Sequence, residues 1–313
     1  MGKRLLFLVG IALYALYSCT YEEIITDHVP PTPPAQKTEV KFASSVIVPT
    51  PSSSRLIGDL WEPGDAIGMF MIEKNRNAVV EGNRNVRYYT KKSCYTCTFT
   101  ATHDFIYFPE DGNEVRFMSY HPYNESVKGT TYKIDVSKQS PQSALNFLYS
   151  FNPESSYDKN IEAGKVPMEF NHQMTKVYIN VKNGHGLQGY DLMNMKVYFT
   201  GLSAQADFNL MTGKMSNLRK SSSIYPSVLI AGNGNVFSAE AILIPETNLP
   251  SDAALVFEMN NGNKDVYKWN LGRSMEIGKK YTFGVTINKT GISVNTTVYN
   301  WHNVGIDQEV GLN

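Results

Sequence analysis

The amino-acid sequence predicts an all-β protein made of two β-sandwich domains. From Thr38 onward apolar and polar residues alternate with a period of two, as in strands with one buried face. Turn sequences rich in asparagine and glycine recur between these stretches, which is typical of β-sandwiches. The chain has 313 residues, 42% of them hydrophobic, and is longer than one core usually serves. We therefore expect two cores.

The start of the chain predicts an export signal. Two basic residues precede an apolar stretch at 5–17, which is shorter than the roughly 20 residues needed to cross a bilayer core and fits a signal peptide. The stretch ends at Ser18 and Cys19, and a small residue before a cysteine at this place resembles the lipobox of bacterial lipoproteins. The resemblance implies removal of residues 1–18 and acylation of Cys19. An ordinary secretory signal with an incidental cysteine is the alternative.

Residues 19–37 are interpreted as a lipidated, proline-rich linker. Glu22 and Glu23 follow the cysteine closely, which resembles the surface-export signal of Bacteroidetes lipoproteins and implies a place outside the outer membrane. Alternatively, the two glutamates only begin a solvated linker. The prolines at 30–34 lack backbone donors, so we expect a stiff polyproline spacer there.

The body of the chain is expected to divide into an N-terminal sandwich at 38–165 and a C-terminal sandwich at 166–313. The polar stretch 152–165, which contains a proline and a glycine, marks the expected boundary. One short helix is expected in a connection at 144–148, after a Ser-Pro cap. Near the far end, the stretch 281–298 predicts a β-hairpin around an Asn-Lys-Thr-Gly turn.

The sequence contains no pattern that argues for catalysis or metal binding. The six histidines form no short ligand pair, and there is no nucleophile elbow or phosphate-binding loop. Cys94 and Cys97 stand in a stretch that predicts a strand, where positions three apart face opposite ways, so we expect two unpaired or incidental thiols and not a redox pair or half of a zinc site. With 29 basic and 29 acidic side chains, no net charge attracts nucleic acid. We therefore expect no enzyme activity, cofactor, metal or nucleic-acid partner.

Four stretches together resemble the fimbrillin family of Bacteroidetes, whose members are subunits and anchors of lipoprotein-derived pili. They are the arginine and the W-x-x-G-D-x-I-G pattern within 55–70, the pair 106–109 and 115–123, the stretch 168–177, and the terminal hairpin that closes at Trp301. The resemblance implies two tandem transthyretin-like sandwiches and assembly of subunits by strand exchange. In the family, a protease that cuts after an arginine triggers the exchange.

The resemblance places the protease cut between Arg55 and Leu56, after an exposed polar loop that suits a trypsin-like enzyme. The alternative is that Arg55 is an ordinary loop cation. The cut would release the first strand, whose apolar residues on one face are Val40, Phe42, Val46 and Val48. Their loss would remove roughly 6–12 kcal/mol of hydrophobic stabilisation in total. The net free energy of unfolding of a whole domain is only about 5–15 kcal/mol. A cut subunit should therefore need another strand in its groove.

A candidate donor strand for that groove lies at the C-terminal end. Its apolar residues on one face are Val304, Ile306, Val310 and Leu312. A final strand of its own domain is the alternative interpretation. The resemblance further implies other pilin subunits as partners, attachment to the outer membrane through the lipid, a place in the fimbrium at the cell surface, and a host glycan or protein receptor. It leaves the stalk, tip and anchor roles open.

A monomeric, glycan-binding surface lipoprotein is the alternative function. Such a protein should present exposed aromatic side chains together on one sheet face, and the candidates are Tyr88, Tyr89, Tyr95, Tyr267 and Trp269. Tyrosine-rich strands are more often ordinary sandwich surface. A structural or adhesive pilus subunit is therefore the favoured function.

Overall fold

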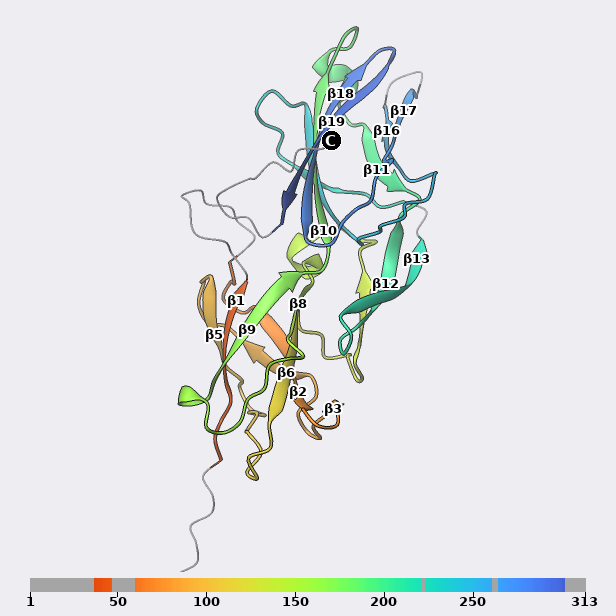
Figure 1. Cartoon of the computed structure of the whole chain (residues 1–313). Coiled ribbons are helices and arrows are strands. Elements are labelled where there is room, and N and C mark those ends of the chain that lie inside the picture. The colour runs from red at the N-terminus through yellow and green to blue at the C-terminus, as the bar shows by residue number, and fades with distance from the viewer. Residues whose placement is uncertain (1–36, 47–59, 221–222, 261–263, 302–313) are drawn as a thin grey trace, which may run out of the picture. The chain divides into compact units, whose positions relative to one another are not determined.

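The computed structural model describes residues 37–46, 60–220, 223–260 and 264–301, all within one compact unit at 37–313 (Figure 1). Strands dominate this part of the chain. Its helical structure consists of short 3₁₀ turns at Gln142–Leu145, Glu162–Gly164 and Gly189–Leu192. Within these residues no helix has the length and apolar character that a membrane crossing requires. The predicted all-β, sandwich-type fold class is confirmed.

The first sheet contains eight strands in the order β3-β2-β6-β8-β9-β1-β5, with β4 also paired to β2 (Figure 1, red to yellow-green). Their bounds are β1 Lys41–Val46, β2 Ala66–Glu73, β3 Ala78–Val79, β4 Val86–Tyr89, β5 Thr96–Phe99, β6 Val115–His121, β8 Leu148–Phe151 and β9 Lys165–His172. β9 alternates exposed and buried side chains along its whole length, whereas every residue of β6 is buried. Alternation of polar and apolar residues, which is the basis of the strand predictions, therefore marks the strands that have one solvent-exposed face.

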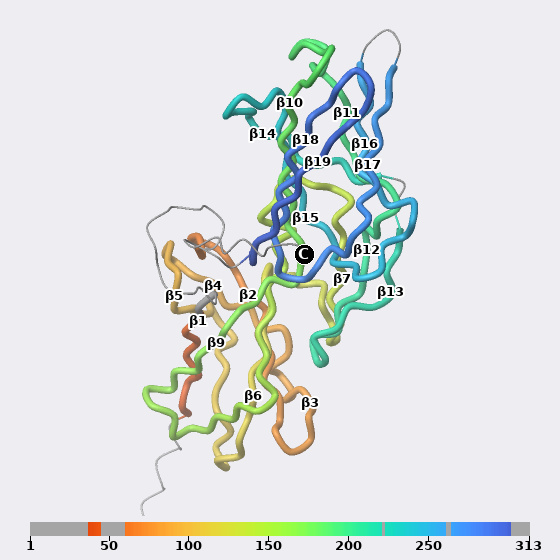
Figure 2. Tube along the Cα trace, turned by 45° about the horizontal axis from the view of Figure 1, so that its top comes forward, coloured from red at the N-terminus to blue at the C-terminus, as the bar shows by residue number. Residues whose placement is uncertain are grey.

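The later strands form one five-stranded sheet, β14-β15-β10-β18-β19, and two three-stranded sheets, β11-β16-β17 and β13-β12-β7. Figure 2 shows β18 and β19 beside β10. The bounds are β7 Thr131–Asp135, β10 Thr175–Asn183, β11 Lys196–Thr200, β12 Ser203–Asn209, β13 Lys214–Lys220, β14 Ser227–Leu229, β15 Phe237–Leu243, β16 Ala254–Glu258, β17 Val266–Asn270, β18 Lys279–Asn288 and β19 Gly291–Asn300. The predicted hairpin at 281–298 is confirmed as β18 and β19, with Asn288 opposite Gly291.

Two hydrophobic clusters fill the described unit, one around β1, β2, β5, β6 and β9 and a larger one that reaches from β2 to the end of β19. The expected boundary at 165 falls on the first residue of β9, which belongs to the first sheet together with β8. β7 precedes this point in the chain but pairs with β12. The division into two domains stays a prediction.

Two local expectations are wrong. The helix expected at 144–148 is a 3₁₀ turn that ends at Leu145, because Leu148 already pairs with neighbouring strands on both sides. Cys94 and Cys97 are not unpaired thiols but form a disulfide, with 5.6 Å between their Cα atoms. The alternation of faces holds only inside a strand, and β5 begins at Thr96, so Cys94 lies before it, in an isolated bridge with Trp61, and a bend at Tyr95 separates the two.

Asp207 on β12 is the centre of a polar network on the three-stranded sheet. Its carboxylate accepts a hydrogen bond from the Asn217 amide at 2.9 Å and pairs with Lys133 at 2.9 Å and Arg219 at 3.2 Å. These three donors lower the pKa of Asp207 to about 2, from an ordinary value of 3.8. The folded protein therefore holds this carboxylate charged at a pH where the unfolded chain has protonated it.

This shift predicts a loss of stability in acid. Because the folded pKa of Asp207 lies below the unfolded one, its stabilising effect is complete above pH 3.8 and disappears as the pH falls towards 2. The free energy of unfolding of the wild type should exceed that of Asp207→Asn near neutral pH. Urea unfolding at several values between about pH 5 and about pH 2 should show this difference narrowing. A constant difference would contradict the assignment.

Candidate functional site

β1 is hydrogen-bonded to strands on both of its edges. It runs antiparallel to β5 and parallel to β9, with Phe42 opposite both Phe99 and Val166. Just before β1 the pairing continues: the Val40 amide donates to the Ile106 carbonyl at 2.9 Å, and the Phe108 amide donates to the Thr38 carbonyl at 3.0 Å. The segment is therefore an interior strand of the sheet and not an edge.

The side chains of Val40 and Phe42 fill the centre of the first hydrophobic cluster, where neither is accessible to solvent. The Phe42 ring packs edge-on against Tyr88 at 4.9 Å and Phe117 at 5.2 Å between centroids. The Tyr88 hydroxyl accepts a hydrogen bond from the Ile106 amide at 2.9 Å, and burial raises the pKa of this hydroxyl to about 12. The Tyr88 hydroxyl beside Phe42 is therefore protonated and uncharged at neutral pH.

Ser44 occupies the next inward position of β1 after Phe42, opposite Cys97 and Met168. Its side chain is completely buried, and its hydroxyl has no hydrogen-bond partner among the described residues. An unsatisfied buried hydroxyl costs about 1–3 kcal/mol. β1 is thus well matched to its groove at Val40 and Phe42 and poorly matched at Ser44.

Replacement of Ser44 with alanine should stabilise the protein. Alanine removes the unpaired hydroxyl and keeps the small volume, so we expect the free energy of unfolding to rise by about 1 kcal/mol. Urea unfolding at neutral pH measures the change. A lower stability than the wild type would mean that the hydroxyl has a partner.

The segment before β1 lies against the backbone of Gly164, which precedes β9. Gly164 has a φ of +64°, in the left-handed region that favours glycine. A Cβ atom at this position would lie 2.7 Å from the carbonyl oxygen of Glu39, closer than real Cβ atoms approach. Glycine is therefore needed for the turn before β9 to approach the residues that lead into β1.

The structure describes only some of the predicted site residues. Val40 and Phe42 share the buried face of the first strand, as the spacing predicts, and the backbone of Val46 ends β1. The other predicted positions lie outside the described residues: Cys19, Val48, Arg55, Leu56, Val304, Ile306, Val310 and Leu312. Sequence reasoning missed Ser44, although its even spacing from Val40 and Phe42 was the signal that could have found it.

The aromatic residues of the alternative function do not form one surface. Tyr88 is buried in the first cluster, whereas Tyr95 is exposed in the loop before β5. Tyr267 and Trp269 belong to β17 in a different sheet, and the Trp269 ring packs on Phe283 at 4.9 Å between centroids. Within the part of the chain that the structure describes, no three histidine, cysteine, aspartate or glutamate side chains are grouped so that they could hold a metal ion.

Comparison with protein families decides the relationship of the chain. A family model described as fimbrillin-like matches residues 54–301. The chain belongs to this family. Fimbrillin-like proteins are a structural class of fimbrial and cell-adhesion proteins, which agrees with the resemblance found in the sequence. Membership implies a place at the cell surface, in a fimbrium, and association with other fimbrial subunits.

Individual relatives support the same conclusion. A Bacteroides uniformis protein named as a candidate fimbrium subunit, Fim1C, is 27% identical over an alignment of 309 positions that covers 96% of each chain. A crystal structure of a candidate cell-adhesion protein from the same species has a TM-score of 0.68 and 26% identity, and the match covers 86% of this chain and 100% of that one. A candidate cell-adhesion protein from Bacteroides ovatus shares the fold, with a TM-score of 0.64 and 19% identity over 87% of this chain and 100% of that one.

Proposed function

We propose that this fimbrillin-like chain is a structural or adhesive subunit of a lipoprotein-derived surface pilus, assembled by protease-triggered strand exchange. The observation that carries the proposal is the position of β1. It is the first described strand and it pairs on both edges, and together with Val40 just before it, its Phe42 fills a hydrophobic core. A strand of this kind can leave only if another one takes its place.

The energy of the vacated groove supports exchange rather than simple loss. Exposing the sites of Val40 and Phe42 alone forfeits roughly 3–6 kcal/mol of hydrophobic stabilisation. The backbone groups of β5 and β9 that face β1 lose their partners as well. This is a large part of the 5–15 kcal/mol that typically stabilises a domain. A subunit that lost β1 would therefore bind any extended segment with apolar residues at alternate positions.

The remaining steps of the proposal concern residues outside the described part. Residues 1–18 act as the signal peptide, and acylated Cys19 anchors the precursor to the outer membrane. A trypsin-like protease cuts between Arg55 and Leu56. The donor strand is the C-terminal segment of another subunit, with Val304, Ile306, Val310 and Leu312 on its inserted face. A host glycan or protein is the receptor of the assembled fimbria.

Limited trypsin treatment of the non-lipidated mature protein tests this assembly. We expect a cut after Arg55, release of the N-terminal fragment, and a ladder of oligomers on gel electrophoresis. Arg55→Ala should remain monomeric because the first strand stays in place. A matched control is Arg76→Ala, which removes a cation that is 79% exposed in the turn between β2 and β3 and should not prevent the ladder.

The test also identifies the donor. A chain shortened after Asn303 should still be cut but should give no ladder. Cut protein that keeps residues 19–55 bound and never forms oligomers would overturn the proposed mechanism. The family membership would stand in that case, because it rests on the comparisons.

A further inference from the structure

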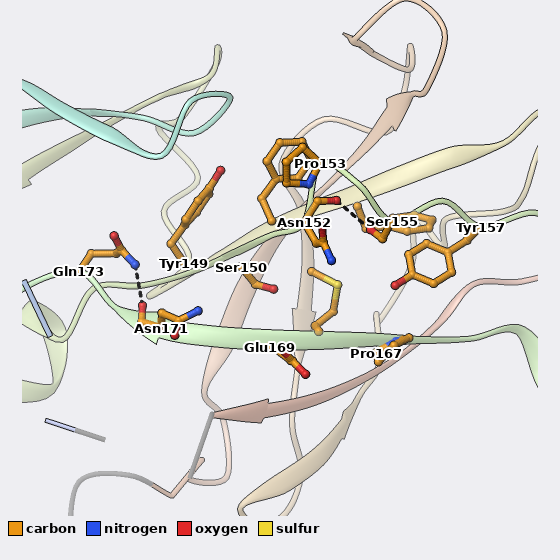
Figure 3. A pocket seen from close by; sticks show the side chains of 13 residues that line it. Tyr149, Ser150, Asn152, Pro153, Ser155, Tyr157, Pro167, Glu169, Asn171 and Gln173 are labelled. Atoms are coloured by element: carbon orange, nitrogen blue, oxygen red, sulfur yellow. Dashed lines mark hydrogen bonds between the residues drawn. The ribbon is translucent and has the colours of Figure 1, made fainter. Parts of the chain in front are cut away.

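A cleft separates β8 from β9 within the first sheet. The two strands pair only at Leu148 with His172 and at Tyr149 with Asn171, although β9 extends back to Lys165. Where they diverge, a cavity of about 410 Å³ opens between them. Figure 3 shows its lining side chains in two rows, one from β8 and the loop after it and one along β9.

Two prolines oppose closure of the cleft. Continuing the β8 and β9 register would place Phe151 opposite Glu169 and then Pro153 opposite Pro167. Neither proline has an N–H group, so this pair cannot form ladder hydrogen bonds. The sheet therefore cannot form ladder hydrogen bonds at this pair, and a peptide strand entering the cleft would find no backbone donor at either proline.

The β8 wall of the cleft is held in place by Arg116. Its guanidinium donates hydrogen bonds to the Pro153 carbonyl at 3.1 Å and to the Asn77 side chain at 2.9 Å. It also lies 5.8 Å from the centroid of the Phe151 ring. Arg116 is itself buried. The opening is therefore a pre-formed feature of the fold rather than a gap between loosely held loops.

The lining combines an apolar floor with polar walls. Phe117 and Met168 are buried core residues, and the half-buried Tyr157 ring lies 6.1 Å from Phe117 between centroids. Asn152, Asn171 and Glu169 are exposed along the walls. Glu169 is the one charged residue of the lining, and its carboxylate forms no ion pair with the described residues.

We propose that this cleft binds a neutral saccharide of one or two sugar units. A sugar ring has apolar C–H faces that suit Tyr157 and the floor, and hydroxyl groups that suit amide and carboxylate partners. Ligand pockets generally measure about 300–1,000 Å³, so the cavity suits a small ligand. The negative charge of Glu169 disfavours acidic sugars. This site rests on the adhesive role proposed above, for which it specifies the glycan class, but it does not depend on strand exchange, which the oligomer ladder tests separately.

Ligand-observed NMR on the non-lipidated mature protein tests the proposal. The probes are the methyl glycosides of glucose, galactose, mannose and N-acetylglucosamine, with sialic acid as an acidic sugar and an extended peptide for comparison. Each is used at up to about 10 mM, because single-sugar affinities are weak. We expect saturation transfer to at least one neutral glycoside, and none to sialic acid or the peptide.

Variants locate the binding. Glu169→Ala and Asn171→Ala should each raise the dissociation constant of the bound glycoside by about tenfold, because each variant loses a hydrogen bond to the sugar. Glu162→Ala, an exposed acidic residue outside the lining, is the matched control and should bind as the wild type does. Thermal unfolding of each variant shows whether the fold is kept. The proposal is overturned if no glycoside binds, if both cleft variants bind unchanged, or if only the peptide or sialic acid binds.

Discussion

Replacing Phe42 with alanine is expected to lower the free energy of unfolding by about 3–5 kcal/mol. The ring is inaccessible to solvent and contacts Tyr88 and Phe117, so its removal leaves a cavity in the first cluster. Urea unfolding of the uncut protein measures the loss. The same variant should release its first strand more readily after protease treatment, because β1 is held partly by this side chain.

Lys41→Ala is the matched control on the same strand. Lys41 is exposed, so its replacement should change the free energy of unfolding by no more than about 0.5 kcal/mol. If Phe42→Ala were as mild as Lys41→Ala, β1 would not hold the core together. The assembly proposal would then lose its energetic basis.

The second large effect is expected from Lys176→Met. The Lys176 ammonium pairs with the Glu240 carboxylate at 3.1 Å, and the two side chains are only 13% and 16% exposed. The ammonium also lies 5.1 Å from the Tyr178 ring and 5.9 Å from the Trp301 ring. Removing the cation leaves Glu240 as a poorly solvated, uncompensated charge. We expect a loss of about 3 kcal/mol in the free energy of unfolding.

A double variant separates the charge from the packing. Lys176→Met combined with Glu240→Gln removes both charges, so it should recover at least half of the stability lost in the single variant. Urea unfolding of the wild type, both single variants and the double variant gives the coupling energy. If the double variant lost as much free energy of unfolding as the two single variants together, the two side chains would act independently.

The parts of the fold that the sequence predicted are those decided by neighbouring residues. The even spacing of Val40 and Phe42 predicts their shared buried face, and the Asn-Lys-Thr-Gly turn predicts the hairpin of β18 and β19. Spacing along a strand says which side is buried but not which strand lies next to it. The parallel pairing of β1 with β9, and of β10 with β18, joins segments more than about one hundred residues apart and left no local signal.

The same limit explains the errors. The neighbours of Cys94 and Cys97 suit one strand, but the Cys94 backbone pairs with Trp61, which is distant in the sequence, and β5 begins only at Thr96. Tyr88 has the alternating context of a surface residue yet lies under β1. The family itself was recognisable from separate motifs, because these cover much of the chain and keep their order.

The chemistry of its residues explains why the candidate site could be predicted only in part. Apolar residues at alternate positions identified the inward face of β1, but a buried serine carries no such signal. The two prolines beside the cleft could not be recognised either, because only a continued β8 and β9 register would bring Pro153 opposite Pro167. Both features require knowledge of the partner strand.

The two neighbours of β1 run in opposite directions, and this affects which way a replacement could enter. A segment inserted in either orientation would again have one parallel and one antiparallel neighbour. Backbone pairing alone therefore does not select the polarity of the incoming chain. The polarity is selected by the order of the side-chain sites in the groove. Along β1 a valine site is followed by a phenylalanine site and then by a site for a small residue, and a strand inserted in the opposite direction would meet these sites in reverse order. Head-to-tail directionality along a filament would thus be encoded in side-chain volume.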